Sequence, residues 1–205
     1  MNETRDSEIH HLIGGELCLD FANTLYGHAD APIHEYLFDY RDLVLWSRHA
    51  GILTDKAALG LLRAANRRAA EANATFRRAI TLRELVHRVY ADLAGGRSPK
   101  ADDLAALHKT WLQALARSTL LKSSAGFRLD WTNGHTLDCM LWPITDSAVQ
   151  LLISKKLQRV KQCNGCDWLF LDGSRNHMRR WCSMDTCGNR IKMRRRQARR
   201  KLAIR

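Results

Sequence analysis

Apolar side chains recur at intervals of three and four along most of the first 157 residues, which is the pattern of helices with one buried face. Asp39 is a favoured residue type at a helix start, and Gly51 is a favoured type at a helix end. Thr54 is a second capping residue, and Ser98-Pro99 offers a cap followed by proline at the first helical position. The pattern predicts helices over residues 16–25, 39–51, 57–70, 75–93, 98–117 and 143–157.

The period of the pattern changes to two near residue 127. Apolar and charged side chains alternate in residues 127–131, residues 137–141 alternate again, and Asn133-Gly134 between them has the chemistry of a tight turn. The pattern therefore predicts a β-hairpin near 127–141 within an otherwise helical domain.

The net charge of +12 comes from the last quarter of the chain. Residues 155–205 contain 16 of the 33 Lys and Arg residues but three of the 21 Asp and Glu residues, so this segment carries +13 and residues 1–154 carry −1. Such asymmetry is typical of a chain in which one unit binds nucleic acid or another anionic surface. It predicts a helical domain over residues 1–157 and a second, basic domain over residues 158–205.

The beginning of the chain lacks the apolar stretch of a secretory signal. No window approaches the roughly 18 to 20 uninterrupted apolar residues of a membrane span. We therefore expect a cytoplasmic protein that does not act at a membrane. Disulfides are rare in that reducing compartment, so the six cysteines require a role in metal binding, catalysis or core packing.

Four of the six cysteines form two closely spaced pairs, Cys163 with Cys166 and Cys182 with Cys187. Two such pairs, separated by fifteen residues, are typical of a tetrahedral zinc site. Four thiolate ligands leave no position open for water or substrate. We therefore expect one Zn²⁺ ion with a structural role.

Alternative roles for these cysteines fit the pattern less well. A redox Cys-x-x-Cys normally lies in a βαβ unit, which the pattern lacks, and it would leave the second pair without a role. An iron–sulfur cluster, or His177 in place of one thiolate, would also use available residue types, but four thiolates suffice for zinc. Cys18 and Cys139 lie among apolar neighbours, and we expect both in the core.

The pattern around the cysteines completes the expected fold. Residues 168–171 have strand character and residues 188–202 have helix character, which places Cys187 in the first turn of a basic helix. Helix amides there favour a thiolate. The predicted fold class is mainly α with a small β-hairpin: a helical N-terminal domain, followed by a C-terminal four-cysteine zinc-finger module of two short strands and a basic helix.

Basic residues dominate the surface of this module. On a helix that starts at Cys187, the residues Ile191, Ala198 and Leu202 share an apolar face, and most arginines lie opposite. A charge run is usually a solvated face, but this one has no acidic residue after Asp185 and repels itself unless an anion is present. The planar guanidinium of arginine suits phosphate. We therefore predict contacts to nucleic acid from Arg175, Asn176, Arg179, Arg180, Asn189, Arg190, Lys192, Arg194, Arg196, Arg199 and Arg200.

Two motifs resemble known families. Residues 168–192, which include the tetrapeptide Cys-Gly-Asn-Arg at 187–190, resemble the CGNR zinc finger. Gly-Gly-Glu-Leu at 14–17, with Leu-Asp-Phe-Ala-Asn-Thr at 19–24, resembles the opening of the ABATE domain, which precedes this finger in bacterial proteins associated with stress-induced transcription regulation. The resemblance implies zinc at the four cysteines and a DNA-binding role. His177 departs from it, because a small or glycine-like residue is expected there.

The resemblance also implies that the N-terminal domain senses a ligand. Asp20, Asn23 and Thr24 are the polar residues that would contact a small-molecule effector, since Asp20 and either of the other two lie on one side of a helical turn. The alternative is that these side chains cap and hold neighbouring backbone.

We therefore expect a zinc-containing, DNA-binding transcription regulator whose N-terminal domain senses a ligand or forms a homodimer. The alternative is an RNA- or protein-interaction module without sequence-specific DNA binding, which a preference for RNA or single strands would favour. The sequence has no Walker A loop, dinucleotide-binding glycine motif, His-Glu-x-x-His motif or nucleophile elbow, so we expect no enzymatic activity.

Overall fold

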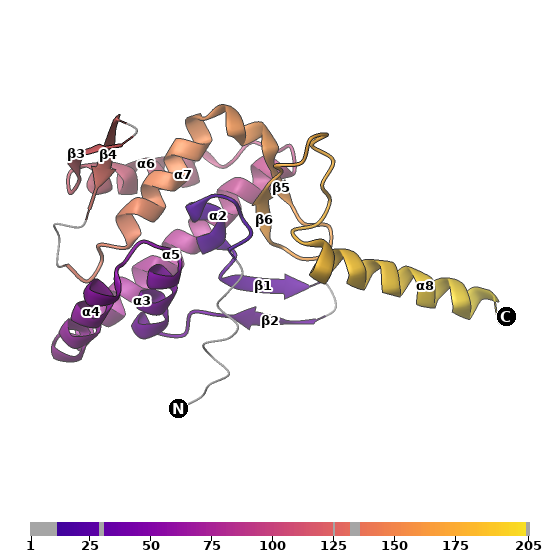
Figure 1. The fold of residues 1–205 in the computed structure, drawn as a ribbon, viewed down its shortest axis with the longest axis horizontal. Coiled ribbons are helices and arrows are strands. Elements are labelled where there is room, and N and C mark those ends of the chain that lie inside the picture. Colours follow the sequence, from indigo (N-terminus) through magenta and orange to yellow (C-terminus); the bar gives the residue numbers. More distant parts are fainter. Residues whose placement is uncertain (1–11, 29–30, 125, 132–135, 204–205) are drawn as a thin grey trace.

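Figure 1 shows the computed structural model, which describes residues 12–28, 31–124, 126–131 and 136–203. Its helices are α2 (Leu17–Ala22), α3 (Tyr40–His49), α4 (Asp55–Arg67), α5 (Ala69–Ala94), α6 (Ala101–Leu115), α7 (Leu141–Ile153) and α8 (Asn189–Ala203), with a 3-10 turn η1 (Lys155–Arg159) and a π-helical turn η2 (Met184–Gly188). Strands within these residues form three antiparallel pairs: β1 (Leu25–His28) with β2 (Ala31–Glu35), β3 (Thr119–Ser123) with β4 (Gly126–Asp130), and β5 (Val160–Gln162) with β6 (Leu169–Leu171). The chain is mainly helical, as predicted.

The long helix α5 forms the centre of the N-terminal part. Its buried residues Leu82, Val86 and Val89 recur at helical spacing. Helices α2, α3, α4, α6 and α7 all contact it. Phe21 of α2 and Trp46 of α3 meet in this core with their ring centroids 5.1 Å apart. Five helices thus bury their apolar faces around one central helix.

Two of the three predicted helix caps are confirmed. The Asp39 carboxylate accepts a hydrogen bond from the N–H of Asp42 at 2.9 Å, and Thr54 caps α4 in the same way. The predicted cap at Ser98-Pro99 is wrong, because α6 begins at Ala101 without a side-chain cap. Two acidic residues in the first turn of α6 complement the helix dipole there instead.

The predicted hairpin near residue 127 is present, but its predicted strand pairing is wrong. Strand β4 pairs with β3, which precedes it in the chain, so that Leu120 lies opposite Leu129 and Lys122 lies opposite Phe127. The predicted second strand, residues 137–141, is a turn that leads into α7.

Burial in the helical core explains this difference. Leu137, Met140 and Leu141 are all buried, so their spacing reflects a turn and a helix start that pack on the other helices. A short apolar run does not by itself distinguish such a turn from a strand. The turn predicted at Asn133-Gly134 lies outside the described residues.

The hairpin of β1 and β2 is not predicted from the sequence. Gly27 and Pro32 lie within its strands, and both residue types weaken a strand signal. The pairing also shifts between Tyr26 and His28, as in a β-bulge. The hairpin extends from α2 toward the C-terminal part of the chain (Figure 1).

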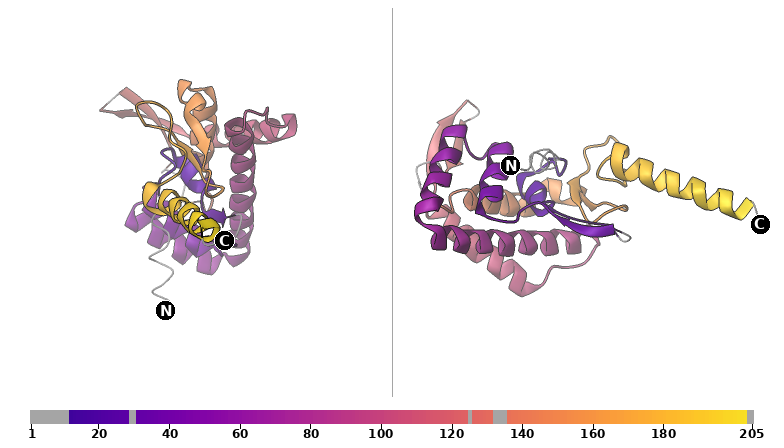
Figure 2. Two further views of the ribbon diagram at one scale, coloured as in Figure 1. Left: turned by 90° about the vertical axis from the view of Figure 1, so that its right-hand side faces the viewer. Right: turned by 90° about the horizontal axis from the view of Figure 1, so that it is seen from below.

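The C-terminal part packs against one end of the helical part. Strands β5 and β6 both contact α5, and β6 also contacts α2. Helix α8 continues directly from η2, and it projects away from the rest of the molecule in Figure 1 and in the right-hand view of Figure 2. The basic helix therefore leaves most of its length open to the surroundings.

Candidate metal centre and basic surface

The four paired cysteines meet in one buried cluster. Their sulfur atoms all lie within 4.8 Å of one another. The sulfurs of Cys166, Cys182 and Cys187 are separated by 3.6 to 3.7 Å. Tetrahedral zinc with a Zn–S distance of roughly 2.3 Å separates its sulfurs by about 3.8 Å. The cluster, completed by Cys163, therefore has the size and the donor set of the predicted structural zinc site.

A tight turn between β5 and β6 carries the first cysteine pair. The N–H of Cys163 donates to the carbonyl oxygen of Trp168 at 2.9 Å, and the N–H of Gly165 donates to the Cys163 sulfur at 3.4 Å. A Cβ atom at Gly165 would lie 3.1 Å from Cβ of Cys187 and 3.0 Å from the side chain of Ile191. The turn thus presents an amide to a thiolate, and glycine allows it to pack directly on the second pair.

The π-helical turn η2 carries Cys187, so this residue lies two positions before α8 begins and not in the first turn of the basic helix, as predicted. Gly188 closes this wide turn before α8 begins, and the exposed side chain of Met184 lies over it, with its sulfur 2.7 Å from the place that a Cβ atom would take. Arg190, in the first turn of α8, donates to the Cys187 sulfur at 3.4 Å. A guanidinium is favourable there because four thiolates around one Zn²⁺ ion carry net negative charge.

Two known families match consecutive parts of the chain. The ABATE family, described as "Putative stress-induced transcription regulator", matches residues 15–155. The chain belongs to the ABATE family. The CGNR zinc finger matches residues 159–200, which include all four cysteines of the cluster. No curated protein matches the chain, and neither family description names an enzymatic reaction. Among the described residues, no helix has the length and apolar character needed to cross a bilayer.

A buried carboxylate organises the basic loop of the CGNR finger, residues 173–181. Asp172 is 0% exposed and accepts hydrogen bonds from the N–H and the hydroxyl of Ser174 at 2.9 and 2.6 Å. It also accepts from the N–H of Arg179 at 3.0 Å and from the ammonium of Lys161 at 2.7 Å. Burial opposes the charge, but these donors outweigh it and hold the pKa of Asp172 below its ordinary value.

The same loop contains a residue in the left-handed region. His177 has a φ of 49°, a conformation that favours glycine. Its carbonyl oxygen accepts a hydrogen bond from Lys161, which also binds Asp172. The family expectation of a small or glycine-like residue at this position thus has a backbone reason.

The predicted nucleic-acid residues divide into two groups. Arg179 and Arg190 are engaged within the finger. Arg179 donates to the carbonyl oxygens of Trp181, at 2.8 Å, and of Cys182, and its guanidinium lies 4.6 Å from the ring centroid of Phe170. The exposed group comprises Arg175, Asn176, Arg180, Asn189, Lys192, Arg194, Arg196 and Arg200. The side chains of Ala198, Arg199 and Leu202 lie outside the described part of the structure.

Asn23 fastens the finger to the ABATE domain. Its buried amide donates to the carbonyl oxygen of Leu169 and accepts from the N–H of the same residue, each at 2.8 Å. One side chain thus pairs with β6 as a neighbouring strand would. The hydroxyl of Thr24 donates to the carbonyl oxygen of Phe21 at 2.7 Å. Both side chains form hydrogen bonds with backbone groups. The sequence leaves this role open as the alternative to effector binding.

Asp20 holds the glycine turn before α2 against the finger. It accepts a hydrogen bond from the N–H of Gly14 at 2.7 Å, and the carbonyl oxygen of Gly14 accepts from the N–H of Leu171 at 2.7 Å. A Cβ atom at Gly15, where φ is 79°, would lie 3.3 Å from Cβ of Leu171. Burial, and to a lesser degree the charge of Glu16, raises the pKa of Asp20 to about 6. Both halves of the ABATE opening motif therefore contact β6.

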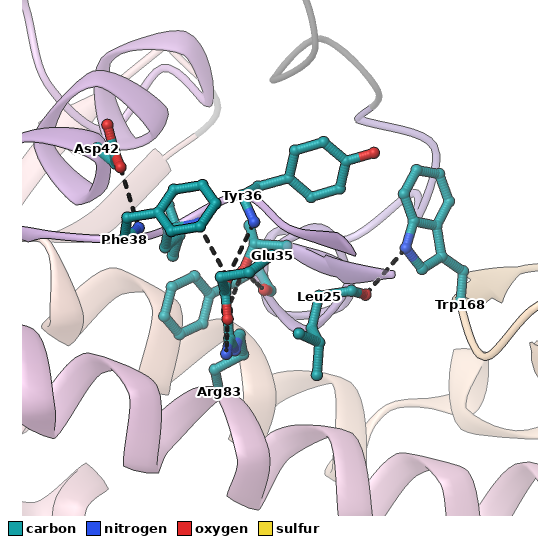
Figure 3. Close-up of polar contacts among 10 residues, drawn as sticks. Leu25, Glu35, Tyr36, Phe38, Asp42, Arg83 and Trp168 are labelled. Atoms are coloured by element: carbon teal, nitrogen blue, oxygen red, sulfur yellow. Dashed lines mark hydrogen bonds and ion pairs between the residues drawn. The ribbon is translucent and has the colours of Figure 1, made fainter. Parts of the chain in front are cut away.

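The β1–β2 hairpin forms a further connection, which the sequence pattern does not reveal (Figure 3). On the finger side, Nε1 of Trp168 donates to the carbonyl oxygen of Leu25 at 3.1 Å. On the other side, the carboxylate of Glu35 binds the guanidinium of Arg83 through two contacts of 2.5 and 2.7 Å. Glu35 also accepts from the N–H of Tyr36 at 3.0 Å. The one sign of this ion pair in the sequence is that Arg83 lies among the apolar residues on the buried face of α5.

The two remaining cysteines belong to the helical domain. Cys18 is fully buried, and Cys139 is half-buried against the same core. Burial raises the pKa of Cys18 to about 12 and that of Cys139 to about 11. Both thiols are therefore neutral near pH 7, as packing residues should be.

Proposed function

We propose that this protein is a DNA-binding transcription regulator whose finger contacts duplex DNA through α8 and the basic loop. The observation that carries the proposal is the character of α8. Eight of its 15 residues are Lys or Arg and none is acidic, and it projects from the zinc site into the surroundings (Figures 1 and 2). A helix of this kind fits the major groove of B-DNA, where arginine and lysine reach both phosphates and guanine edges.

The zinc site supports this proposal by giving the helix a fixed origin. The cluster includes Cys187 of η2, and η2 runs directly into α8. Beyond that point the exposed cations of α8, such as Lys192, Arg196 and Arg200, have no counter-charge on their own helix. Binding to phosphates neutralises them and releases condensed counterions, which is the main source of affinity in such complexes.

Fluorescence anisotropy tests the proposal with the full zinc-loaded chain. The probes are a labelled duplex DNA, one of its single strands and an RNA duplex, each titrated between about 50 and 200 mM salt. Binding to the DNA duplex should weaken steeply with salt. Arg196→Gln and Lys192→Gln should each reduce the slope of log affinity against log salt by about one. Arg63→Gln, at an exposed position of α4, is the matched control and should leave the slope unchanged.

Each other outcome has a definite meaning. A preference for RNA or for the single strand would replace duplex DNA as the partner and favour the interaction-module alternative. Affinity that does not change with salt would contradict phosphate contacts by α8. No binding to any of the three probes at low salt would refute a nucleic-acid function.

We propose further that the ABATE domain controls how the finger is held, and that an effector or a second copy acts through this domain. The support is the set of contacts to the finger strand and the cysteine turn, which come from Asn23, Gly14 and the β1–β2 hairpin. Any change in α2 or in that hairpin would move these contacts. The Asn23 variants described below test this coupling when they are titrated with the DNA duplex.

A further inference from the structure

The β3–β4 hairpin exposes a continuous apolar face. Leu120 is 66% exposed and Phe127 is 72% exposed. Paired residues of an antiparallel sheet point to the same side, and side chains alternate along each strand. The observed register therefore places Leu120, Lys122, Phe127 and Leu129 on one face of the hairpin. Lys122 is the one charged residue among these four.

The rest of the described chain leaves this face uncovered. The two strands pair with each other, and no further described strand joins either edge. The base of the hairpin is tied to α6 by a hydrogen bond from Nε1 of Trp131 to the carbonyl oxygen of Ala114, at 2.8 Å. An isolated two-stranded hairpin is marginally stable in water, and a partner that covers its exposed apolar face would stabilise it.

We infer that this face binds the same face of a second copy of the chain, about a two-fold axis. Charge favours such a partner. The hairpin lies at the opposite end of the molecule from α8 (Figures 1 and 2). Residues 1–154 carry −1 whereas the +13 of residues 155–205 lies in the finger, so two copies that meet at their hairpins keep their basic parts far apart.

The chemistry of the face also suits a self-complementary contact. Arg128, on the other face, is paired with Asp130 at 2.8 Å, so Lys122 is the one remaining charged residue of the two strands, and a single lysine gives a strongly charged partner little to bind. In a two-fold contact the leucine and phenylalanine of one copy pack on those of the other. Lys122 lies near the turn, where its ammonium reaches water at the rim.

The exposed area predicts a reversible dimer. The exposed parts of Leu120 and Phe127 correspond to roughly 250 to 300 Å² per copy, given about 150 to 250 Å² for a large apolar side chain. With the flanking atoms, two copies would bury about 800 to 1,000 Å², which is below the roughly 1,200 to 2,000 Å² of a stable interface. We therefore expect dissociation in the micromolar range.

Analytical ultracentrifugation of the full zinc-loaded chain, without nucleic acid, tests this inference independently of DNA binding. The wild type should pass from monomer to dimer as its concentration rises from about 1 to 100 μM. Leu120→Thr with Phe127→Thr keeps residues that favour strands but removes the apolar face. This double variant should dimerise at least tenfold more weakly. Ile153→Thr, at a position that is 71% exposed on α7, is the matched control and should behave as the wild type does.

Hydrogen exchange gives a second measurement that needs no variant. In the wild type, amides of β3 and β4 should become more protected as the concentration rises, while those of α4 should not change. A wild type that stays monomeric at about 100 μM, or a double variant that dimerises as strongly as the wild type, would overturn the inference. Circular dichroism of the double variant confirms that its helices are intact.

Discussion

Replacing Asn23 by alanine should loosen the finger from the ABATE domain. The substitution removes both hydrogen bonds to Leu169 and leaves the N–H and the carbonyl oxygen of that residue, which is 0% exposed, without partners. A buried backbone group without a partner costs about 1 to 3 kcal/mol, so the two groups together cost roughly 2 to 6 kcal/mol. This is a large part of the roughly 5 to 15 kcal/mol that stabilises a typical domain.

Hydrogen exchange measured by mass spectrometry locates this loss. Amides of β5 and β6 should exchange faster in Asn23→Ala than in the wild type, whereas the centre of α5 should stay protected. Unfolding in guanidinium chloride gives the change in free energy. Zinc content should remain one ion per chain, because the cysteines form their own cluster with Phe170 and Trp168, separate from the helical core. The DNA titration of this variant shows whether docking of the finger affects binding.

Asn23→Asp is the control that separates the lost hydrogen bonds from a change of shape. Near pH 7 its carboxylate accepts from the N–H of Leu169 but repels the carbonyl oxygen, so the variant is destabilised. Burial raises the pKa of such a carboxyl group, and protonation as the pH falls toward about 5 restores a donor. The difference in free energy of unfolding between Asn23→Asp and the wild type should therefore become smaller on acidification. The difference between Asn23→Ala and the wild type should not. An alanine variant within about 0.5 kcal/mol of the wild type, with unchanged exchange at β6, would refute the reasoning.

Two further predictions concern the finger itself. Removing zinc with a chelator should unfold residues 160–205 and leave the helical domain folded, because the finger has a small apolar cluster of its own; unchanged resistance of that segment to proteolysis would contradict this. Asp172→Asn should cost about 2 kcal/mol near pH 7, since it removes charge-assisted hydrogen bonds. The folded pKa of Asp172 is lowered, so this contribution is complete above about pH 4 and is lost as the pH falls through the folded value. Denaturation of both proteins from pH 7 downward should show their difference shrinking; a constant difference would exclude the charge as its cause.

Local chemistry accounts for the features that could be predicted from the sequence. The spacing of the two cysteine pairs predicts the metal cluster because each pair closes a short turn and zinc requires four donors at one distance. Asp39 and Thr54 are found at helix starts because each side chain bonds an amide three residues later. Helical periodicity predicts α3, α4 and α7 to within about four residues of each end, since it depends on the buried face of each helix alone. It predicts the end of α5 to within one residue, but α5 begins six residues before the predicted start.

Errors arose where a local pattern competes with long-range packing. Residues 137–141 alternate like a strand, but in the structure they form a turn and a helix start that are buried in the core. Strand β4 pairs instead with β3, which precedes it. The β1–β2 hairpin has weak strand signals, and its place depends on Arg83 and Trp168, which are distant in the chain. Burial by distant elements decided these features.

The sequence by itself determined the composition of the molecule: a helical domain, a closed four-cysteine zinc site and a concentration of positive charge beside it. The tertiary structure decided which polar side chains form hydrogen bonds within the protein and which remain exposed. Asn23 binds Leu169, which lies 146 positions away in the chain. Asp172 is buried and accepts from the N–H of Arg179, whose side chain donates to a carbonyl oxygen within the finger. The hydrogen-bond partners of these side chains depend on which polar groups are buried together, and only the folded chain determines which groups those are. The physical reason is that desolvation and hydrogen-bond pairing depend on distance in space, whereas caps and metal turns depend on distance along the chain.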